Sequence, residues 1–138
     1  MQYAICDPCN AIMTKRIIHT PNAPEPKGPY NQAIVAGNTI YVAGQGPIDP
    51  QTGKVVIGTL QEQATLTFEN IRAILNAAGF AMSDVVKVTA YLTDLGDFGK
   101  YNEVYQKFFT EPYPARATVG CQLLMHTFIE VDCIAVKD

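Results

Sequence analysis

The spacing of apolar residues along this chain changes from strand-like to helix-like and back, and the order of these changes restricts the fold. Residues 59–78 repeat apolar side chains at helical spacing, and Thr59 with Glu62 forms a capping-box pattern at the start. Gly79 follows as a helix stop signal. Residues 98–109 predict a second helix, and we interpret the aromatic residues on one of its faces as core: Tyr101, Tyr105 and Phe108.

Strand patterns surround these two helices. They occur at 15–19, 31–35, 39–43, 86–92, 116–123 and 127–136. Gly37 and Asn38 give a two-residue hairpin signal, and the last two segments predict a closing β-hairpin. In the segment 86–92 the predicted buried positions are Val86, Val88, Ala90 and Leu92. The order of elements predicts an α+β fold, with one sheet and two helices on one of its faces.

The final predicted strand has two different faces. One face is apolar, and we expect helices to cover it: Ile129, Val131, Cys133 and Ala135. The other face carries Glu130 and Asp132 between Phe128 and Ile134. A face that mixes acidic and apolar side chains favours a subunit interface that holds a cleft.

The composition fits one globular domain. The 138 residues are enough to bury a core, and 48% of them are apolar and 17% charged. The net charge is −3 and no basic stripe is present, which argues against nucleic-acid binding. No apolar run reaches the length of a membrane span, so we expect no membrane partner.

The first 12 residues differ in character from the rest. Cys6 and Cys9 form a CxxC pattern, which could be redox-active or half of a zinc site. There is no second CxxC, so we favour chance cysteines in a disordered leader at 1–12, followed by one domain at 13–138. This cysteine usage indicates a reducing compartment, and we expect the cytoplasm, with the mitochondrion left open. The other two cysteines lie in strand-like segments and are interpreted as core: Cys121 and Cys133.

Arg116 is the residue whose position first suggests a functional site. It is one of three arginines, and it alone lies at the start of an apolar strand-like segment, after a turn-rich stretch with two prolines. A guanidinium is a permanently charged fork that suits a carboxylate. The alternative is a strand-edge arginine that is solvated or paired with an acid.

Five short motifs place Arg116 in a wider pattern. They occur in this order: Gly28-Pro29-Tyr30, Val42-Ala43-Gly44-Gln45-Gly46-Pro47, Asp49-Pro50-Gln51-Thr52-Gly53, Pro114-Ala115-Arg116-Ala117-Thr118 and Ile129-Glu130-Val131-Asp132-Cys133-Ile134-Ala135. Together they resemble the Rid family (YjgF-type proteins, also called endoribonuclease L-PSP), and most closely its RidA branch. The resemblance runs from about Thr14 to the C-terminus.

This resemblance implies both an assembly and a reaction. It implies a six-stranded mixed sheet of the chorismate-mutase type and a homotrimer with one cleft at each subunit interface. The cleft would bind a 2-imino acid, such as 2-iminobutanoate or 2-iminopropanoate, or its enamine tautomer. Hydrolysis would release a 2-keto acid and ammonia. No cofactor and no metal are expected, because an imine carbon is already electrophilic.

The resemblance also implies roles for individual residues. Arg116 would grip the substrate carboxylate, and Glu130 would orient or activate the attacking water, with a solvent-facing strand carboxylate as its alternative. Tyr30 would pack over the substrate, with a core-filling loop tyrosine as the alternative. Asn102 matches a helix asparagine of the family and would bind substrate. Gly44 would let the backbone approach a ligand, with a β-bulge as the alternative.

Two positions depart from the common RidA pattern. Ala43 stands where the family often has serine, so a hydroxyl is missing. Thr118 stands where the family usually has cysteine, and we expect it still to contribute to substrate binding while any thiol chemistry is lost. Two other functions stay open: an endoribonuclease or translation inhibitor, and a non-catalytic metabolite-binding or chaperone-like module that uses the same clefts.

Overall fold

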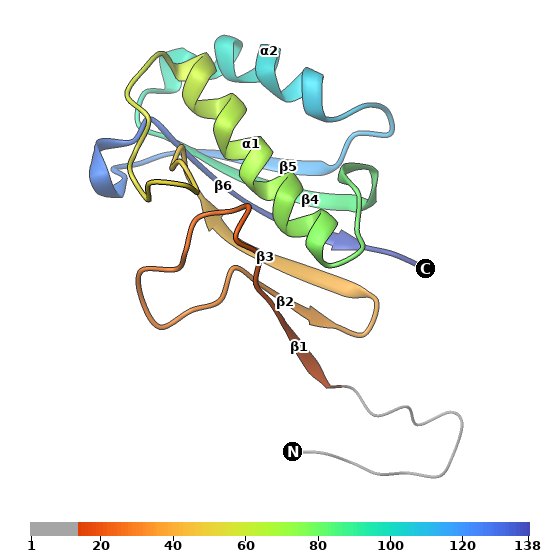
Figure 1. Cartoon of the computed structure of the whole chain (residues 1–138). Coiled ribbons are helices and arrows are strands. Elements are labelled where there is room, and N and C mark those ends of the chain that lie inside the picture. The colour runs from red at the N-terminus through yellow and green to blue at the C-terminus, as the bar shows by residue number, and fades with distance from the viewer. Residues whose placement is uncertain (1–13) are drawn as a thin grey trace, which may run out of the picture.

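The computed structural model describes residues 14–138, so the leader and its CxxC pattern lie outside the described residues. Within these residues, two α-helices pack on one face of a six-stranded mixed sheet (Figure 1). The predicted α+β class is therefore confirmed. The helices are α1 Leu60–Ala77 and α2 Phe98–Phe108. The strands are β1 Lys15–Ile18, β2 Ala33–Ala36, β3 Thr39–Gln45, β4 Val85–Leu92, β5 Ala115–Gly120 and β6 Ile129–Val136.

The strands lie in the order β1-β2-β3-β6-β4-β5. Neighbouring strands are antiparallel except β4 and β5, which run parallel with α2 in the connection between them. The predicted closing hairpin is therefore wrong, because β4 lies between β5 and β6. The predicted strands at 116–123 and 127–136 left a turn short enough for a hairpin, but β5 ends at Gly120 and β6 begins at Ile129, so residues 121–128 form a longer connection that passes β4.

Both ends of α1 are fixed by local hydrogen bonds. The Thr59 hydroxyl accepts from the Glu62 amide, and the Glu62 carboxylate accepts from the Thr59 amide, each at 3.2 Å. This confirms the predicted capping box. At the other end Gly79 has a φ of 84°, which glycine adopts without steric cost, and the Phe80 amide donates to the Leu75 carbonyl at 2.9 Å.

The core lies between the helices and the sheet. Phe68 of α1 and Tyr101 of α2 are fully buried there, and so is the predicted face of β6: Ile129, Val131, Cys133 and Ala135. Two predictions about the core are wrong. Val85 is buried in place of Val86, because a register shift at the start of β4 displaces the alternation. Cys121 follows β5 at a partly exposed position.

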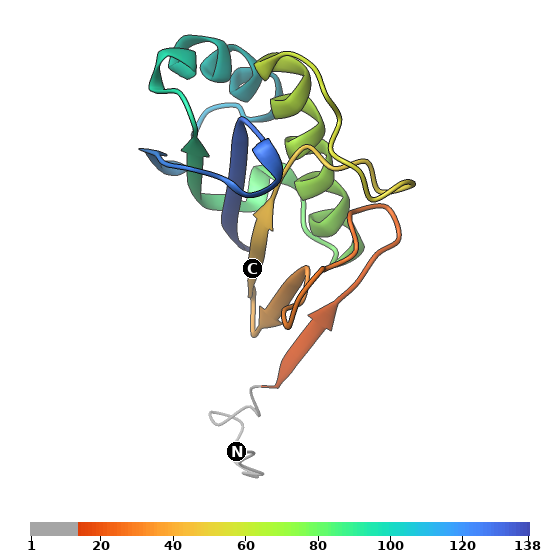
Figure 2. The same cartoon turned by 90° about the vertical axis from the view of Figure 1, so that its left-hand side faces the viewer.

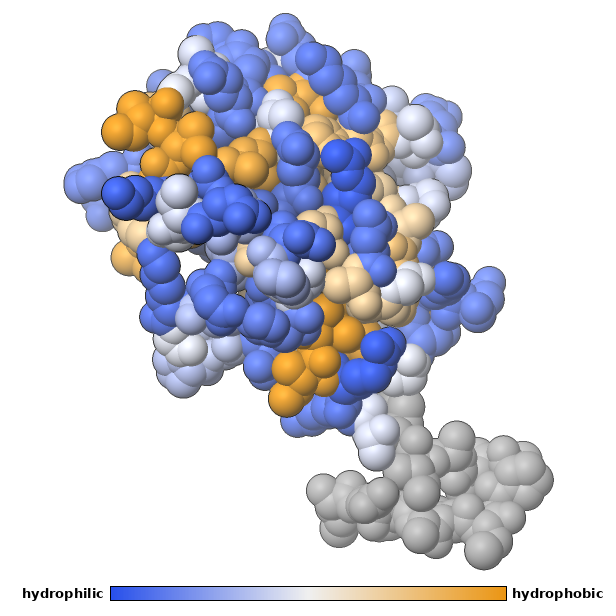
Figure 3. Space-filling model, in the orientation of Figure 1, coloured by the Kyte–Doolittle hydropathy of each residue, from blue (hydrophilic) through white to orange (hydrophobic). Residues whose placement is uncertain are grey.

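Within residues 14–138, no helix covers the sheet face opposite α1 and α2 (Figure 2). Four apolar side chains align across the first four strands of the sheet on this face: Ile17, Ile34, Tyr41 and Ile134. Glu130 and Asp132 lie on the same face, as predicted. Figure 3 shows the opposite, helix-covered side of the molecule, where hydrophobic side chains gather in separate patches among hydrophilic ones.

The helices of residues 14–138 are too short or too polar to cross a membrane.

Candidate functional site

Arg116 lies near the start of β5 and on the helix-covered side of the sheet, since its partner on β4, Val88, is fully buried. Its guanidinium carbon lies 5.5, 5.0 and 4.6 Å from the ring centroids of Phe98, Tyr101 and Tyr105. These distances are within the roughly 6 Å range of cation–π attraction. The three rings of α2 therefore stabilise the charge and restrict how the guanidinium can turn.

The charge of Arg116 is not neutralised by this part of the chain. The side chain is half-buried, and it forms no ion pair with any carboxylate among residues 14–138. Pairing with an acid, one of the alternatives for this residue, is therefore not found within these residues. A partly desolvated charge gains from a hydrogen-bonded counter-ion. The position suits an incoming anion.

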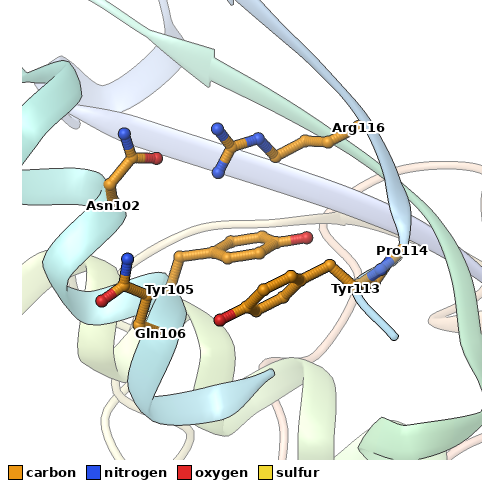
Figure 4. A pocket seen from close by; sticks show the side chains of 6 residues that line it. All are labelled: Asn102, Tyr105, Gln106, Tyr113, Pro114 and Arg116. Atoms are coloured by element: carbon orange, nitrogen blue, oxygen red, sulfur yellow. The ribbon is translucent and has the colours of Figure 1, made fainter. Parts of the chain in front are cut away.

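A cavity of about 350 Å³ opens beside this guanidinium (Figure 4). Its walls come from α2 and from the segment that leads into β5. The lining residues are Asn102, Tyr105, Gln106, Tyr113, Pro114 and Arg116. The predicted residues Arg116 and Asn102 are thus brought together, on two elements that are adjacent in space.

Three buried polar atoms near Arg116 have no hydrogen-bond partner within residues 14–138: the hydroxyls of Tyr101 and Tyr105, and Oδ1 of Asn102. Burial raises the pKa of Tyr105 to about 12. Burial also raises the pKa of Tyr101, with the Arg116 charge acting in the opposite direction. Both hydroxyls therefore stay protonated at neutral pH. An unpaired buried polar group costs about 1–3 kcal/mol, so this region favours a polar ligand or water.

Glu130 and Gly44 lie together on the uncovered face of the sheet. A Cβ atom on Gly44 would lie 2.5 Å from Glu130 Oε2 and 3.0 Å from its Cδ, so a side chain here would displace the carboxylate. The register of β3 also shifts between Val42 and Gln45, so the bulge expected as the alternative for Gly44 is present too. Burial, and then the charge of Asp132, raise the pKa of Glu130.

Arg116 and Glu130 lie on opposite faces of the sheet. Glu130 alternates with the buried residues Ile129 and Val131, whereas Arg116 shares the side of the buried Val88. The expectation that a hairpin brings the two side chains to one cleft is wrong for a single chain, because β4 separates their strands.

The other two predicted site residues do not line the cavity. Thr118 pairs with the buried Ala90 and so lies on the Arg116 side of the sheet, but it does not line the cavity. Tyr30 is 52% exposed in the loop before β2, so the core-filling alternative is wrong. Its hydroxyl accepts a long hydrogen bond, 3.4 Å, from the Lys27 amide.

Four cavity residues are absent from the predicted site residues: Tyr105, Gln106, Tyr113 and Pro114. The core interpretation of Tyr105 is confirmed, but its ring is also a cavity wall. The signal was present in the spacing, since Asn102, Tyr105 and Gln106 stand at i, i+3 and i+4 on one helix face. No group of three or more His, Cys, Asp or Glu side chains in residues 14–138 is arranged to hold a metal ion.

Residues 20–137 match the family model described as endoribonuclease L-PSP. A RutC family protein of Pyrococcus abyssi is 53% identical over 91% of this chain and 100% of its own length. A 2-iminobutanoate/2-iminopropanoate deaminase of Dermatophagoides farinae is 43% identical over 88% of this chain and 96% of its own length. The crystal structure of E. coli TdcF with bound serine aligns with a TM-score of 0.84 and 41% identity, over 89% of this chain and 99% of that one.

Proposed function

Because this chain belongs to the Rid family, which the endoribonuclease L-PSP model describes, we propose that it hydrolyses reactive 2-imino acids to 2-keto acids and ammonia. The observation that carries the proposal is the half-buried guanidinium of Arg116, which lines a cavity and has no counter-ion among residues 14–138. A relative bears the name of a 2-iminobutanoate/2-iminopropanoate deaminase. Small substrates of that class are the first to test.

Arg116 binds the substrate carboxylate in this proposal. Two parallel N–H donors match the two carboxylate oxygens, and this fork fixes the direction of the imine carbon. The rings of Phe98, Tyr101 and Tyr105 hold the guanidinium from the α2 side. The bound serine in the TdcF structure also carries a carboxylate next to a nitrogen-bearing carbon, which supports a site for molecules of this shape.

The reaction then needs only water and a base. Water adds to the C=N bond: its oxygen bonds to the carbon, Glu130 takes one of its protons and returns it to the nitrogen, which receives the π electrons. The resulting carbinolamine loses its hydroxyl proton as the C=O bond forms, and the C–N bond breaks as the nitrogen takes up that proton and leaves as ammonia. No electron is gained or lost by the substrate, so the step needs no redox partner. The raised pKa of Glu130 favours this role, since a base works best when its pKa lies close to the working pH.

One chain does not hold both groups on one face, so we place the cleft between two copies. The uncovered face carries Glu130 beside the apolar row of Ile17, Tyr41 and Ile134, which a second copy would bury. The homotrimer implied by the family resemblance supplies three such clefts, each with Arg116 from one subunit and Glu130 from the next.

The remaining predicted residues fit this shared cleft as substrate-binding groups. Asn102 adds a buried carbonyl oxygen that can accept the imine N–H. Thr118 follows Arg116 along the same side of β5. Gly44 makes room for the Glu130 carboxylate, and the exposed ring of Tyr30 is free to pack over a substrate.

The test couples the purified protein to a threonine dehydratase, which produces 2-iminobutanoate. Semicarbazide competes for the imine, and 2-ketobutyrate is measured. We expect the protein to increase 2-ketobutyrate formation in proportion to its concentration, whereas Arg116→Ala does not. No increase at any protein concentration would contradict the proposal.

Endoribonuclease activity is the second candidate, because the matching family model carries that description. The net charge of −3 gives little attraction to phosphates. A labelled RNA incubated with the same preparation distinguishes the two functions. Cleavage that survives Arg116→Ala, without deaminase activity in the wild type, would favour the ribonuclease.

A further inference from the structure

We infer that the cavity beside Arg116 accommodates the side chain of a bulky 2-imino acid, with an aromatic side chain preferred over the ethyl or methyl group of the small acids. This inference rests on the proposed function, because Arg116 determines where the carboxylate binds. It names a substrate class for the same site and assigns its selectivity to Tyr105 and Tyr113.

The size of the cavity supports a larger substrate. Its volume is about 350 Å³, which is inside the range of about 300–1,000 Å³ found for small-molecule sites. A four-carbon imino acid held by Arg116 would leave most of that space to solvent. A phenyl group would occupy much of it.

Two aromatic rings line the cavity. Tyr105 comes from α2 and is 5% exposed, and Tyr113 comes from the segment before β5 and is 48% exposed. Figure 4 shows both rings on the same side of the Arg116 guanidinium. Pro114 adds a further apolar surface. A planar ring that packs against these side chains gains both buried area and the offset or edge contacts that aromatic pairs prefer.

The exposure of Tyr113 points to the same conclusion. A large ring that is half in water at the rim of a cavity can still bury apolar surface against a ligand. Arg116 carries the only charge among these lining residues and is already paired with the substrate carboxylate, so no lining residue would balance a charged substrate side chain. Neutral and apolar side chains are therefore favoured over acidic or basic ones.

A matched substrate series tests the inference. An L-amino acid oxidase generates 2-imino acids from L-2-aminobutyrate, L-leucine and L-phenylalanine in one assay, with semicarbazide as the competing trap. We expect kcat/KM for the phenylalanine-derived acid to exceed that for the four-carbon acid by about tenfold, consistent with one added ring contact. The leucine-derived acid should lie between them.

The outcomes separate this inference from the proposed function. Turnover of the four-carbon acid without turnover of the aromatic one overturns the inference and leaves the deaminase intact. A preference for the leucine-derived acid over the aromatic one overturns the aromatic assignment. No turnover of any imino acid overturns both.

Variants of Tyr113 test the residue itself. Tyr113→Ala should lower the ratio of aromatic to four-carbon kcat/KM by about tenfold, whereas Tyr113→Phe should keep it, since the ring makes the contact. Ile57→Ala is the control, because Ile57 is 95% exposed in the loop before α1 and does not line the cavity. An equal loss for both substrates, or a changed mass in light scattering, would mean that Tyr113 supports the fold or an interface, and would overturn its assignment.

Discussion

At the scale of single residues, the environment of Arg116 explains why an arginine is required there. A guanidinium is flat and weakly hydrated, so it can lie against the rings of Phe98, Tyr101 and Tyr105 and still present N–H groups to a carboxylate. A lysine ammonium is a compact point charge with a strong hydration shell. It would lose hydration among these rings and could not form two parallel hydrogen bonds.

We therefore expect Arg116→Ala to lower kcat/KM for the imino acid by a factor on the order of a hundred, a loss of about 3 kcal/mol in transition-state binding, with little change in the circular dichroism spectrum. Arg116→Lys should also be poor, because it keeps the charge without the fork. Turnover and circular dichroism are measured on the same preparations. Full turnover in Arg116→Ala would remove the carboxylate-binding role, and an unfolded Arg116→Ala would make Arg116 a structural residue.

Gly44 provides a way to move Glu130 without changing its chemistry. A Cβ atom at position 44 would overlap the Glu130 carboxylate, which lies at the flexible end of its side chain and can therefore shift. We expect Gly44→Ala to lower kcat by about tenfold, as a misplaced base does, with little change in 2-keto acid affinity. Gly99→Ala is the matched control, because no other group lies within 4 Å of a Cβ at that position. If Gly44→Ala retains full kcat, the position of Glu130 is unimportant for the water step.

The raised pKa of Glu130 predicts how stability depends on pH. Burial and the charge of Asp132 disfavour the ionised Glu130 carboxyl in the folded state, so its folded-state pKa is higher than its unfolded pKa of about 4.3. Glu130 therefore stabilises the fold below its unfolded pKa, and this contribution is lost as the pH rises through its folded-state pKa. Glu130→Gln has no such titration. We expect the difference between the Tm of Glu130→Gln and the Tm of the wild type to be more positive at pH 7 than at pH 4, as measured by differential scanning calorimetry. A Tm difference that is the same at both pH values would contradict the assigned environment.

At the scale of elements, α2 builds the site from two neighbouring strips of residues. Phe98, Tyr101 and Tyr105 stand three and four residues apart and present their rings to Arg116. Asn102 and Gln106 are also four residues apart and line the cavity. One helix therefore both holds the guanidinium and forms a cavity wall.

This arrangement predicts different effects for two substitutions of Tyr101. Tyr101→Leu removes the ring face and should weaken 2-keto acid binding about fivefold, because a partly buried cation–π contact is worth about 1 kcal/mol. Tyr101→Phe keeps the ring and removes a buried hydroxyl that has no partner in residues 14–138, so affinity should hold and Tm should not fall. Calorimetric titration and thermal melting measure both effects. Equal loss of affinity in the two variants would show that the hydroxyl, not the ring, matters.

The same elements show which structural features could be predicted from the sequence. The ends of α1 depend on residues within a few positions of one another, so Thr59, Glu62 and Gly79 were sufficient to predict them. The pairing of β5 with β4 depends on contacts that no local pattern encodes. The opposite-face placement of Arg116 and Glu130 follows from that pairing, and it was therefore missed. The displaced burial at Val85 follows from a register shift that no Gly or Pro marks.

At the scale of the whole molecule, the separation of Arg116 and Glu130 makes assembly a part of the proposed mechanism. The uncovered face carries a row of apolar side chains, in which Ile17 is 64% exposed and Tyr41 is 50% exposed. Burying such a row removes apolar surface from water and so favours association. Light scattering at micromolar concentration should give the mass of a trimer, and a monomer would contradict the shared cleft.

Mixing two variants that each lack one of the proposed catalytic groups tests the shared cleft directly. In a closed trimer with one cleft between each pair of neighbours, every mixed trimer of Arg116→Ala and Glu130→Gln chains contains one cleft with both wild-type groups. Random co-assembly of equal amounts makes about three quarters of the trimers mixed, so co-expressed chains should recover about a quarter of wild-type activity. Separately purified variants that are combined without subunit exchange should stay inactive and serve as the control. If co-expression restores no activity while each chain assembles normally, Arg116 and Glu130 do not complete one site across an interface.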